Sequence, residues 1–273
     1  MNSITSSTQY TDSKLNISLK PVKYAFGLIL AGCVVMFLIL HLGLTWLYGR
    51  ADETWVRIGV AAVMLIVAVI CQRWLFKVGT GKALLTLGYR YAHLRAILAA
   101  AIISVVMLAY FPVFTAITDV PVSLKSNWLW ILLGIIAVQG LGEETLFRGY
   151  VFGNLRKLGI SFQRAGFISM AIFAVVHLVL FTQNPFIVGF LGTLVAVTYA
   201  FPMAYLYERG NNTIWAPALL HVTSSAVRLV DVPEASYMTV VSVWIAMQIV
   251  TPFLVFAFLG NLLKQQDTRE RVR

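Results

Sequence analysis

Charged residues are scarce in this chain of 273 residues. Asp, Glu, Lys and Arg make up 12% of it, hydrophobic residues make up 59%, and the mean hydropathy is +0.82. Soluble globular domains typically carry about 25% charged residues. Cysteine is also nearly absent, because only Cys33 and Cys71 are present and both lie in apolar runs. The composition therefore excludes an ordinary soluble domain, and no disulfide framework or thiolate metal motif is predicted.

Long apolar runs recur from Val22 onward. About 20 apolar residues cross a bilayer, and a helix satisfies its own backbone hydrogen bonds there. The predicted fold class is all-α, a polytopic membrane bundle of about eight transmembrane helices, with kinks near Pro112, Pro202, Pro217 and Pro252. The approximate segments are 22–47, 55–76, 94–116, 128–151, 162–182, 186–207, 213–230 and 237–263.

The basic residues predict the orientation of the bundle. In this arrangement 17 of the 21 Lys and Arg residues lie on one side, which the positive-inside rule assigns to the cytoplasm together with both termini. The net charge of +10 thus reflects topology, and no nucleic-acid partner is predicted. We expect a disordered cytoplasmic tail over 1–20, one transmembrane domain over 21–264, and a basic cytoplasmic tail over 265–273. The expected location is a bacterial inner membrane.

Three charges interrupt the fourth apolar segment. A charged side chain at the centre of a membrane helix costs at least ~2.5–3.5 kcal/mol, so Glu143, Glu144 and Arg148 indicate a functional site. Glu144 and Arg148 are four residues apart, which suits an ion pair on one helix face. Glu143 is turned about 100° away and is predicted to face a cavity. Alternatively, both glutamates serve Arg148 as a structural pin.

Two histidines lie in similarly apolar settings. His177 is about fifteen residues into the fifth segment, and His221 shares a helix face with Pro217 and Ser225 in the seventh. A carboxylate and an imidazole can deprotonate a water, while a second imidazole and a hydroxyl stabilise an oxyanion. Alternatively, Glu143, His177 and His221 could hold Zn²⁺. The H-E-x-x-H signature is absent, so zinc is not favoured and no cofactor is predicted. The remaining histidines are interpreted as structural: His41 and His93.

Three motifs together resemble a known family. They are Glu143-Glu144-x-x-x-Arg148, Phe173-x-x-x-His177 and His221-x-x-x-Ser225, preceded by the run Gly-Asn-Asn-Thr-Ile-Trp-Ala-Pro-Ala-Leu-Leu-His over 210–221. In this order they resemble the CPBP intramembrane proteases, the CAAX-protease and bacteriocin-processing family that includes the type II CAAX prenyl endopeptidase. The resemblance covers about residues 128–230, and that family is regarded as glutamate-type peptidases.

The resemblance implies a role for each matching residue. Glu143 and His177 would activate the attacking water, and Glu144 with Arg148 would be the supporting ion pair. His221 and the residue four positions later would form the oxyanion site, although the family usually has asparagine where this chain has Ser225. A hydroxyl donates only one hydrogen bond, so activity depends on Ser225, or on Ser224 or Thr223 in its place.

The predicted function is intramembrane hydrolysis of a peptide bond near the cytoplasmic leaflet. The expected partners are the lipid bilayer and a substrate that is a membrane protein or a lipid-anchored peptide. The substitution at Ser225 leaves a second hypothesis open, a non-proteolytic scaffold or bacteriocin-immunity-type protein of the same fold. A proton-coupled transporter would use the same buried groups as a relay, but the resemblance explains their spacing and transport does not.

Overall fold

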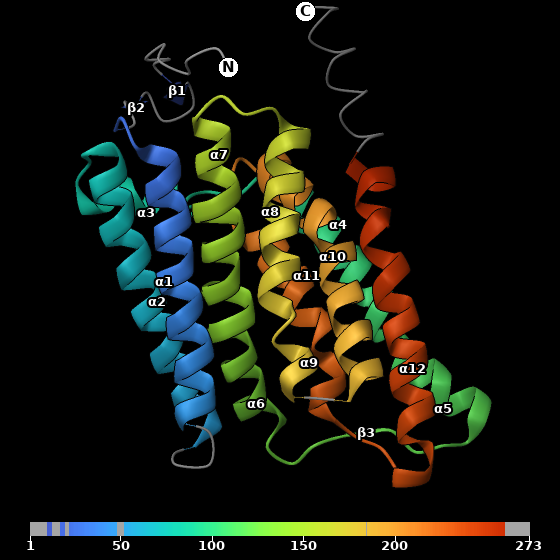
Figure 1. Cartoon of the computed structure of the whole chain (residues 1–273). Coiled ribbons are helices and arrows are strands. Elements are labelled where there is room, and N and C mark those ends of the chain that lie inside the picture. Colours follow the sequence, from blue (N-terminus) through green and yellow to red (C-terminus); the bar gives the residue numbers. More distant parts are fainter. Residues whose placement is uncertain (1–9, 13–16, 20–21, 48–51, 184, 260–273) are drawn as a thin grey trace, which may run out of the picture.

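The computed structural model describes residues 10–12, 17–19, 22–47, 52–183 and 185–259. Its helices run side by side in one bundle, with the helix over Trp128–Lys157 near the middle (Figure 1). Within the described part, seven helices are long and apolar enough to cross a membrane, so the all-α polytopic fold is confirmed. These seven are Ala25–Thr45, Glu53–Phe76, Leu94–Thr118, Trp128–Lys157, Phe162–Thr182, Phe186–Arg209 and Glu234–Leu259.

The elements follow one another with short connections. The α-helices are α1 (Ala25–Leu47), α2 (Glu53–Phe76), α3 (Thr80–Thr86), α4 (Leu94–Leu108), α5 (Tyr110–Thr118), α6 (Trp128–Ile135), α7 (Gly153–Lys157), α8 (Phe162–His177), α9 (Leu180–Gln183), α10 (Phe186–Arg209), α11 (Trp215–Ser224) and α12 (Glu234–Val250). The strands are β1 (Tyr10–Asp12) with β2 (Ile17–Leu19), and β3 (Ser123–Leu124) with β4 (Val230–Asp231), and both pairs are antiparallel. The rest of the predicted N-terminal tail, and all of the C-terminal tail, lie outside the described residues.

The seventh predicted segment, 213–230, is not a spanning helix. It consists of α11, a 3₁₀ turn over Ala226–Leu229 and β4. The helix ends at a run of hydroxyl residues, where Thr223 donates to the carbonyl of Leu219 and Ser224 to that of His221. Such hydroxyls compete with the backbone for hydrogen bonds. This shorter path still crosses the bundle, because the Ile214 amide bonds to Gly88 at one end and β4 pairs with β3 at the other.

The helix that carries the three charges is wider than an α-helix in its centre. Between α6 and α7 its hydrogen bonds follow the i→i+5 pattern of a π-helix over Ile136–Glu143 and Thr145–Phe152. Such turns are rare and are frequent at functional sites. At Gly149 an added Cβ would collide with the carbonyl oxygen of Leu87, so glycine lets the α3–α4 connection pack directly on this helix.

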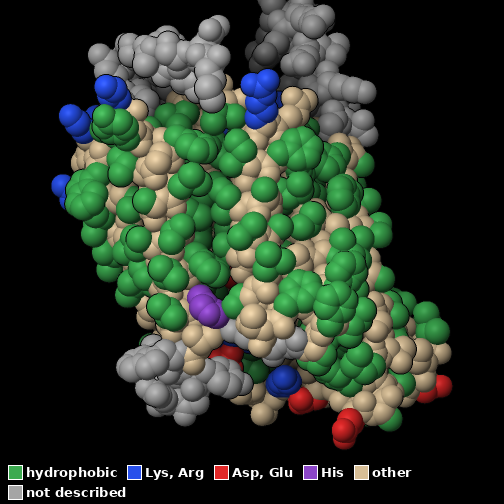
Figure 2. Space-filling view, viewed as in Figure 1, with side chains coloured by type: hydrophobic (Ala, Val, Ile, Leu, Met, Phe, Trp, Pro, Cys, Tyr) green, Lys and Arg blue, Asp and Glu red, His purple; other side chains and the backbone are tan. Residues whose placement is uncertain are grey.

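The two ends of the bundle differ in charge (Figure 2). One end, called the basic end here, holds α3, the start of α1 and the end of α7 (Figure 1). The other, called the acidic end, holds β3 and β4. The described charges of the basic end are Lys23, Arg73, Lys77, Lys82, Arg90, Arg95, Arg156, Lys157, Arg164, Arg209 and Glu208. Those of the acidic end are Asp52, Glu53, Arg57, Asp119, Lys125, Arg228, Asp231 and Glu234. That the basic end faces the cytoplasm stays a prediction.

Candidate active site

A buried ion pair joins two residues of the central helix. Arg148 Nη1 donates to Glu144 Oε1 over 2.9 Å, and the two side chains are 3% and 0% exposed. The ion pair inferred from their spacing is therefore present. The same Glu144 oxygen lies 2.6 Å from Nδ1 of His221 in α11. Glu144 thus connects two elements, and its carboxylate sets the orientation of the imidazole.

Glu143, His177 and His221 line one cavity of about 370 Å³. Glu143 Oε2 lies 3.8 Å from Nε2 of His221, and each of the two side chains is 13% exposed. Glu143 and His177 also line a second cavity of about 590 Å³ between α1 and α8. The structure therefore brings together the three residues that the sequence predicts as catalytic.

The hydrogen bonds indicate a proton on Nδ1 of each imidazole. His177 Nδ1 lies 2.8 Å from the carbonyl oxygen of Phe173. A carbonyl only accepts, so Nδ1 carries the proton and Nε2 of neutral His177 is an acceptor. His221 Nδ1 meets the carboxylate of Glu144 and is likewise protonated. A doubly protonated imidazole donates from both ring nitrogens, so in that form Nε2 of His221 is a donor as well.

The hydroxyls after His221 point to different places. Ser225 and Ser224 both line the 370 Å³ cavity. Ser224 donates to the His221 carbonyl over 2.6 Å. Thr223 is buried, and its hydroxyl, which donates to Leu219, lies 2.8 Å from that of Ser104 in α4. It is not among the residues that line this cavity. The suggestion that Thr223 takes the place of the family's asparagine is therefore wrong.

Other polar groups at the cavities were not singled out from the sequence. Gln139 and Gln248 line the smaller cavity, and Gln139 Oε1 is buried without a hydrogen-bond partner among the described residues. His41 lines the larger cavity, so its interpretation as purely structural is incomplete, and Arg57 lines both. Gln139 lies four residues before Glu143, and that spacing could have identified it.

Glu143, His177 and His221, the ligands of the zinc alternative, line the same cavity. Each histidine has its Nδ1 engaged, by Phe173 in one case and by Glu144 in the other. Zinc-ligating histidines engage their other ring nitrogen in the same way, so these contacts do not exclude a metal. In the part of the chain that is described, no three His, Cys, Asp or Glu side chains are placed to hold a metal ion.

The comparison with protein families agrees with this geometry. Residues 125–227 match the model of the family described as type II CAAX prenyl endopeptidase Rce1-like. The resemblance to the CAAX-protease family is confirmed. The matched segment contains all six residues assigned to the site. The match supports a protease-type enzyme of the intramembrane CAAX kind, in a lipid environment. No curated protein matches the chain.

Proposed function

We propose that the chain is an intramembrane endopeptidase that hydrolyses a peptide bond with a water activated by Glu143 and His177. The observation that supports this most is the shared cavity of Glu143, His177 and His221, into which Ser225 also projects. Its substrate is a membrane protein or a lipid-anchored peptide, and its location is a bacterial inner membrane.

In this mechanism Glu143 accepts the proton of the water as its oxygen attacks the peptide carbonyl carbon. His177 Nε2 holds the same water by accepting its other hydrogen, since its Nδ1 hydrogen is directed at Phe173. The developing oxyanion receives hydrogen bonds from His221 Nε2 and from the Ser225 hydroxyl. Glu143 then returns its proton to the leaving amine, which completes hydrolysis without a covalent intermediate.

The role of Glu144 and Arg148 in this proposal is support. Glu144 keeps His221 protonated at Nδ1 and oriented, over 2.6 Å. Arg148 balances the remaining charge of the pair and lies 5.0 Å from the ring centroid of Phe173. Phe173 in turn contacts the ring of His177, with centroids 4.3 Å apart. One buried cation therefore supports the surroundings of both histidines.

The test is cleavage of candidate membrane peptides by the purified full chain in detergent. Glu143→Gln and His177→Phe should each lower the rate by about 10²–10⁴-fold, which is the usual contribution of a general base. Lys82→Ala, an exposed change in α3, should leave the rate unchanged. Full activity in the Glu143→Gln, His177→Phe double variant would refute the proposal. Metal content and the effect of a chelator on the same sample separate the zinc mechanism from the glutamate one.

A second candidate is a scaffold or immunity-type protein of the same fold. It is favoured by Ser225, which provides a single donor where the resembling family usually has a carboxamide. In this case Glu143→Gln would leave the cellular phenotype intact. Loss of the phenotype with Glu143→Gln, at equal protein abundance, would decide for the protease.

A further inference from the structure

We infer that the site is served from the acidic end of the bundle, so that the substrate is a peptide segment on the extracytoplasmic side of the membrane. That this segment is a substrate rests on the proposed function, whereas the placement of the cavity does not depend on it. It replaces the expectation of cleavage near the cytoplasmic leaflet.

Part of the lining of the two cavities comes from helix ends at the acidic end. Leu44 belongs to the last turns of α1, Arg57 to the second turn of α2, and Gly192 to the second turn of α10. Arg228 follows α11 and lies next to β4, and its Nη2 donates to Glu53 over 3.0 Å. The cavity thus extends from Glu143 toward the acidic end, where Figure 2 shows acidic side chains together with an arginine or lysine.

The opposite direction is filled by the α3–α4 connection. Leu87 packs on Gly149 with backbone contact, one turn beyond Glu144. The Tyr89 hydroxyl lies 2.7 Å from that of Thr145, which directly follows Glu144. Burial raises the pKa of Tyr89 above its usual range, so this hydroxyl stays neutral. These contacts cover the buried glutamate on the side of the basic end.

A hydrogen-bonded polar layer lies beyond that cover. Gln72 and Asn154 bond to each other at 2.8 and 3.0 Å, and Gln72 also donates to Thr86. Lys157 donates to the carbonyl of Thr86 over 2.8 Å. All four side chains are buried. The cavity beside Thr86 and Lys157 measures about 10 Å³, at the lower limit for one water molecule. A peptide has no path through this layer.

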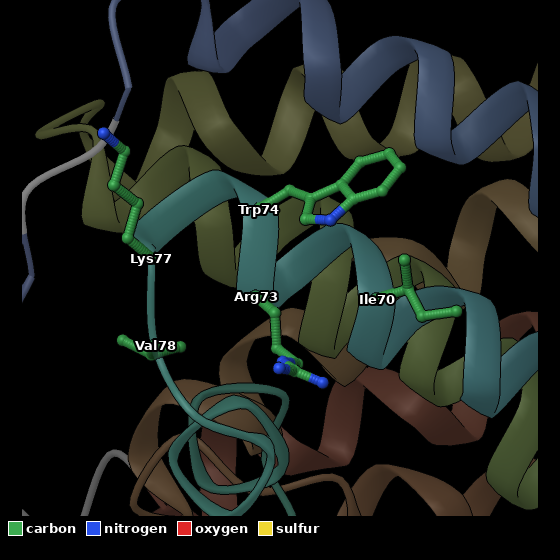
Figure 3. A pocket seen from close by; sticks show the side chains of 5 residues that line it. All are labelled: Ile70, Arg73, Trp74, Lys77 and Val78. Carbon is green, nitrogen blue, oxygen red and sulfur yellow. The ribbon is translucent and has the colours of Figure 1, made fainter.

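Charge then assigns the acidic end to the outside. Among the described residues, the basic end holds ten Lys or Arg side chains and Glu208, which pairs with Arg156 at 2.6 Å. Close to this end, Arg73, Trp74 and Lys77 surround a surface pocket of about 420 Å³ (Figure 3). Cations beside an exposed tryptophan suit the anionic head groups of the cytoplasmic leaflet. The positive-inside rule therefore places the mouth of the catalytic cavity on the other face.

The larger cavity also gives the substrate a lateral entry. Its α1 wall runs from Phe37 to Thr45, about 12 Å along the helix at 1.5 Å per residue. Its other wall is formed by α8 and α9, from Val176 to Leu180, and it ends at Glu143 and His177. Because this wall is largely apolar and begins at the acidic end, it suits an apolar membrane-bound peptide. The scissile bond would lie beside Glu143, about midway along the central helix Trp128–Lys157.

The experiment is cysteine labelling in the full chain, expressed in bacterial spheroplasts with Cys33 and Cys71 replaced by alanine. Leu44→Cys probes the mouth of the cavity, Glu234→Cys the acidic end and Lys82→Cys the basic end. A membrane-impermeant maleimide is added before or after lysis. We expect Leu44→Cys and Glu234→Cys to react in intact spheroplasts, and Lys82→Cys to gain at least tenfold in labelling upon lysis. A cytoplasmic protein with an accessible thiol is the control, and its lack of labelling before lysis confirms that the membrane is intact.

Two results would overturn the inference: labelling of Lys82→Cys in intact spheroplasts, or labelling of Leu44→Cys only after lysis. Neither depends on proteolysis, so a failure of the proposed function is distinguishable. If cleavage is found, a bulky maleimide on Leu44→Cys should slow it more than tenfold, and the same reagent on Lys82→Cys should not. Inhibition through Lys82→Cys alone would contradict entry from the acidic end.

Discussion

Removal of the Glu144 carboxylate should destabilise the fold more than removal of its partner Arg148. In the Glu144→Met variant, Arg148 keeps a guanidinium that is 3% exposed but loses its carboxylate, and His221 loses the acceptor at 2.6 Å. In Arg148→Met, by contrast, Glu144 keeps its hydrogen bond with His221. The asymmetry follows from the position of Glu144 between Arg148 and His221.

The expected magnitudes follow from the burial of the pair. Removing one partner of a buried ion pair costs about 3–5 kcal/mol, because the remaining charge is uncompensated. We expect this cost for Glu144→Met and a smaller one for Arg148→Met. Replacing both charges by apolar groups of similar volume is often neutral or stabilising. The double variant should therefore be more stable than Glu144→Met, while His221 Nδ1 still lacks an acceptor, at about 1–3 kcal/mol.

The assay is reversible unfolding of the four proteins in mixed micelles, followed by far-UV circular dichroism. A double-mutant cycle then gives the coupling energy between positions 144 and 148. We expect a coupling of more than about 1 kcal/mol, within the range for residues that share a network. A coupling near zero, or a larger loss with Arg148→Met than with Glu144→Met, would refute the network. Activity should stay low in the double variant, because His221 is no longer held.

Three further predictions concern the catalytic groups and the packing. If the Ser225 hydroxyl binds the oxyanion, Ser225→Ala should lower kcat by about 10²–10³-fold, whereas Ser225→Asn should retain activity. Equal rates in the two variants would exclude a role of Ser225 in oxyanion binding. Gln139→Met should raise KM more than it lowers kcat if its unpartnered oxygen binds the substrate backbone, and steady-state kinetics separate the two effects. Gly149→Ala should cost about 1–3 kcal/mol in unfolding free energy through the clash with Leu87, while Gly27→Ala, with open space at its Cβ, should be neutral or stabilising.

Much of the bundle could be predicted because a lipid bilayer allows a spanning segment only a few backbone structures. Apolar run length gives the spans, and seven of the eight predicted segments begin within three residues of a described spanning helix. The exception is 213–230, where composition alone does not reveal that hydroxyls end α11 at Ser224. The π-helical hydrogen bonds around Glu143 were also missed, because the length of an apolar run does not distinguish a π-helix from an α-helix.

The sequence predicts which residues belong to the candidate site, but not which of them contact one another. Spacing of four residues suffices to pair Glu144 with Arg148, since both lie on one helix. No spacing rule connects Glu144 to His221, which is 77 residues away and on another element. The same holds for Gln248 and His41, which come from the last and first spanning helices. Such contacts arise from how helices pack, which one sequence does not specify.

Glu144 bonds to both Arg148 and His221, and this explains how the short helix α11 can take part in the site. With ten residues, α11 is too short to cross a membrane, and it ends in hydroxyls that weaken its last turn. Besides the apolar packing of Ala216 and Leu220, two polar contacts hold it in place: His221 to Glu144 of the central helix, and Thr223 to Ser104 of α4. The carboxylate that supports the imidazole chemically also holds the helix that carries it. Loss of Glu144 should consequently reduce stability and activity together, whereas changes at Ser225, whose side chain has no hydrogen bond to another helix within the described part of the chain, should affect activity alone.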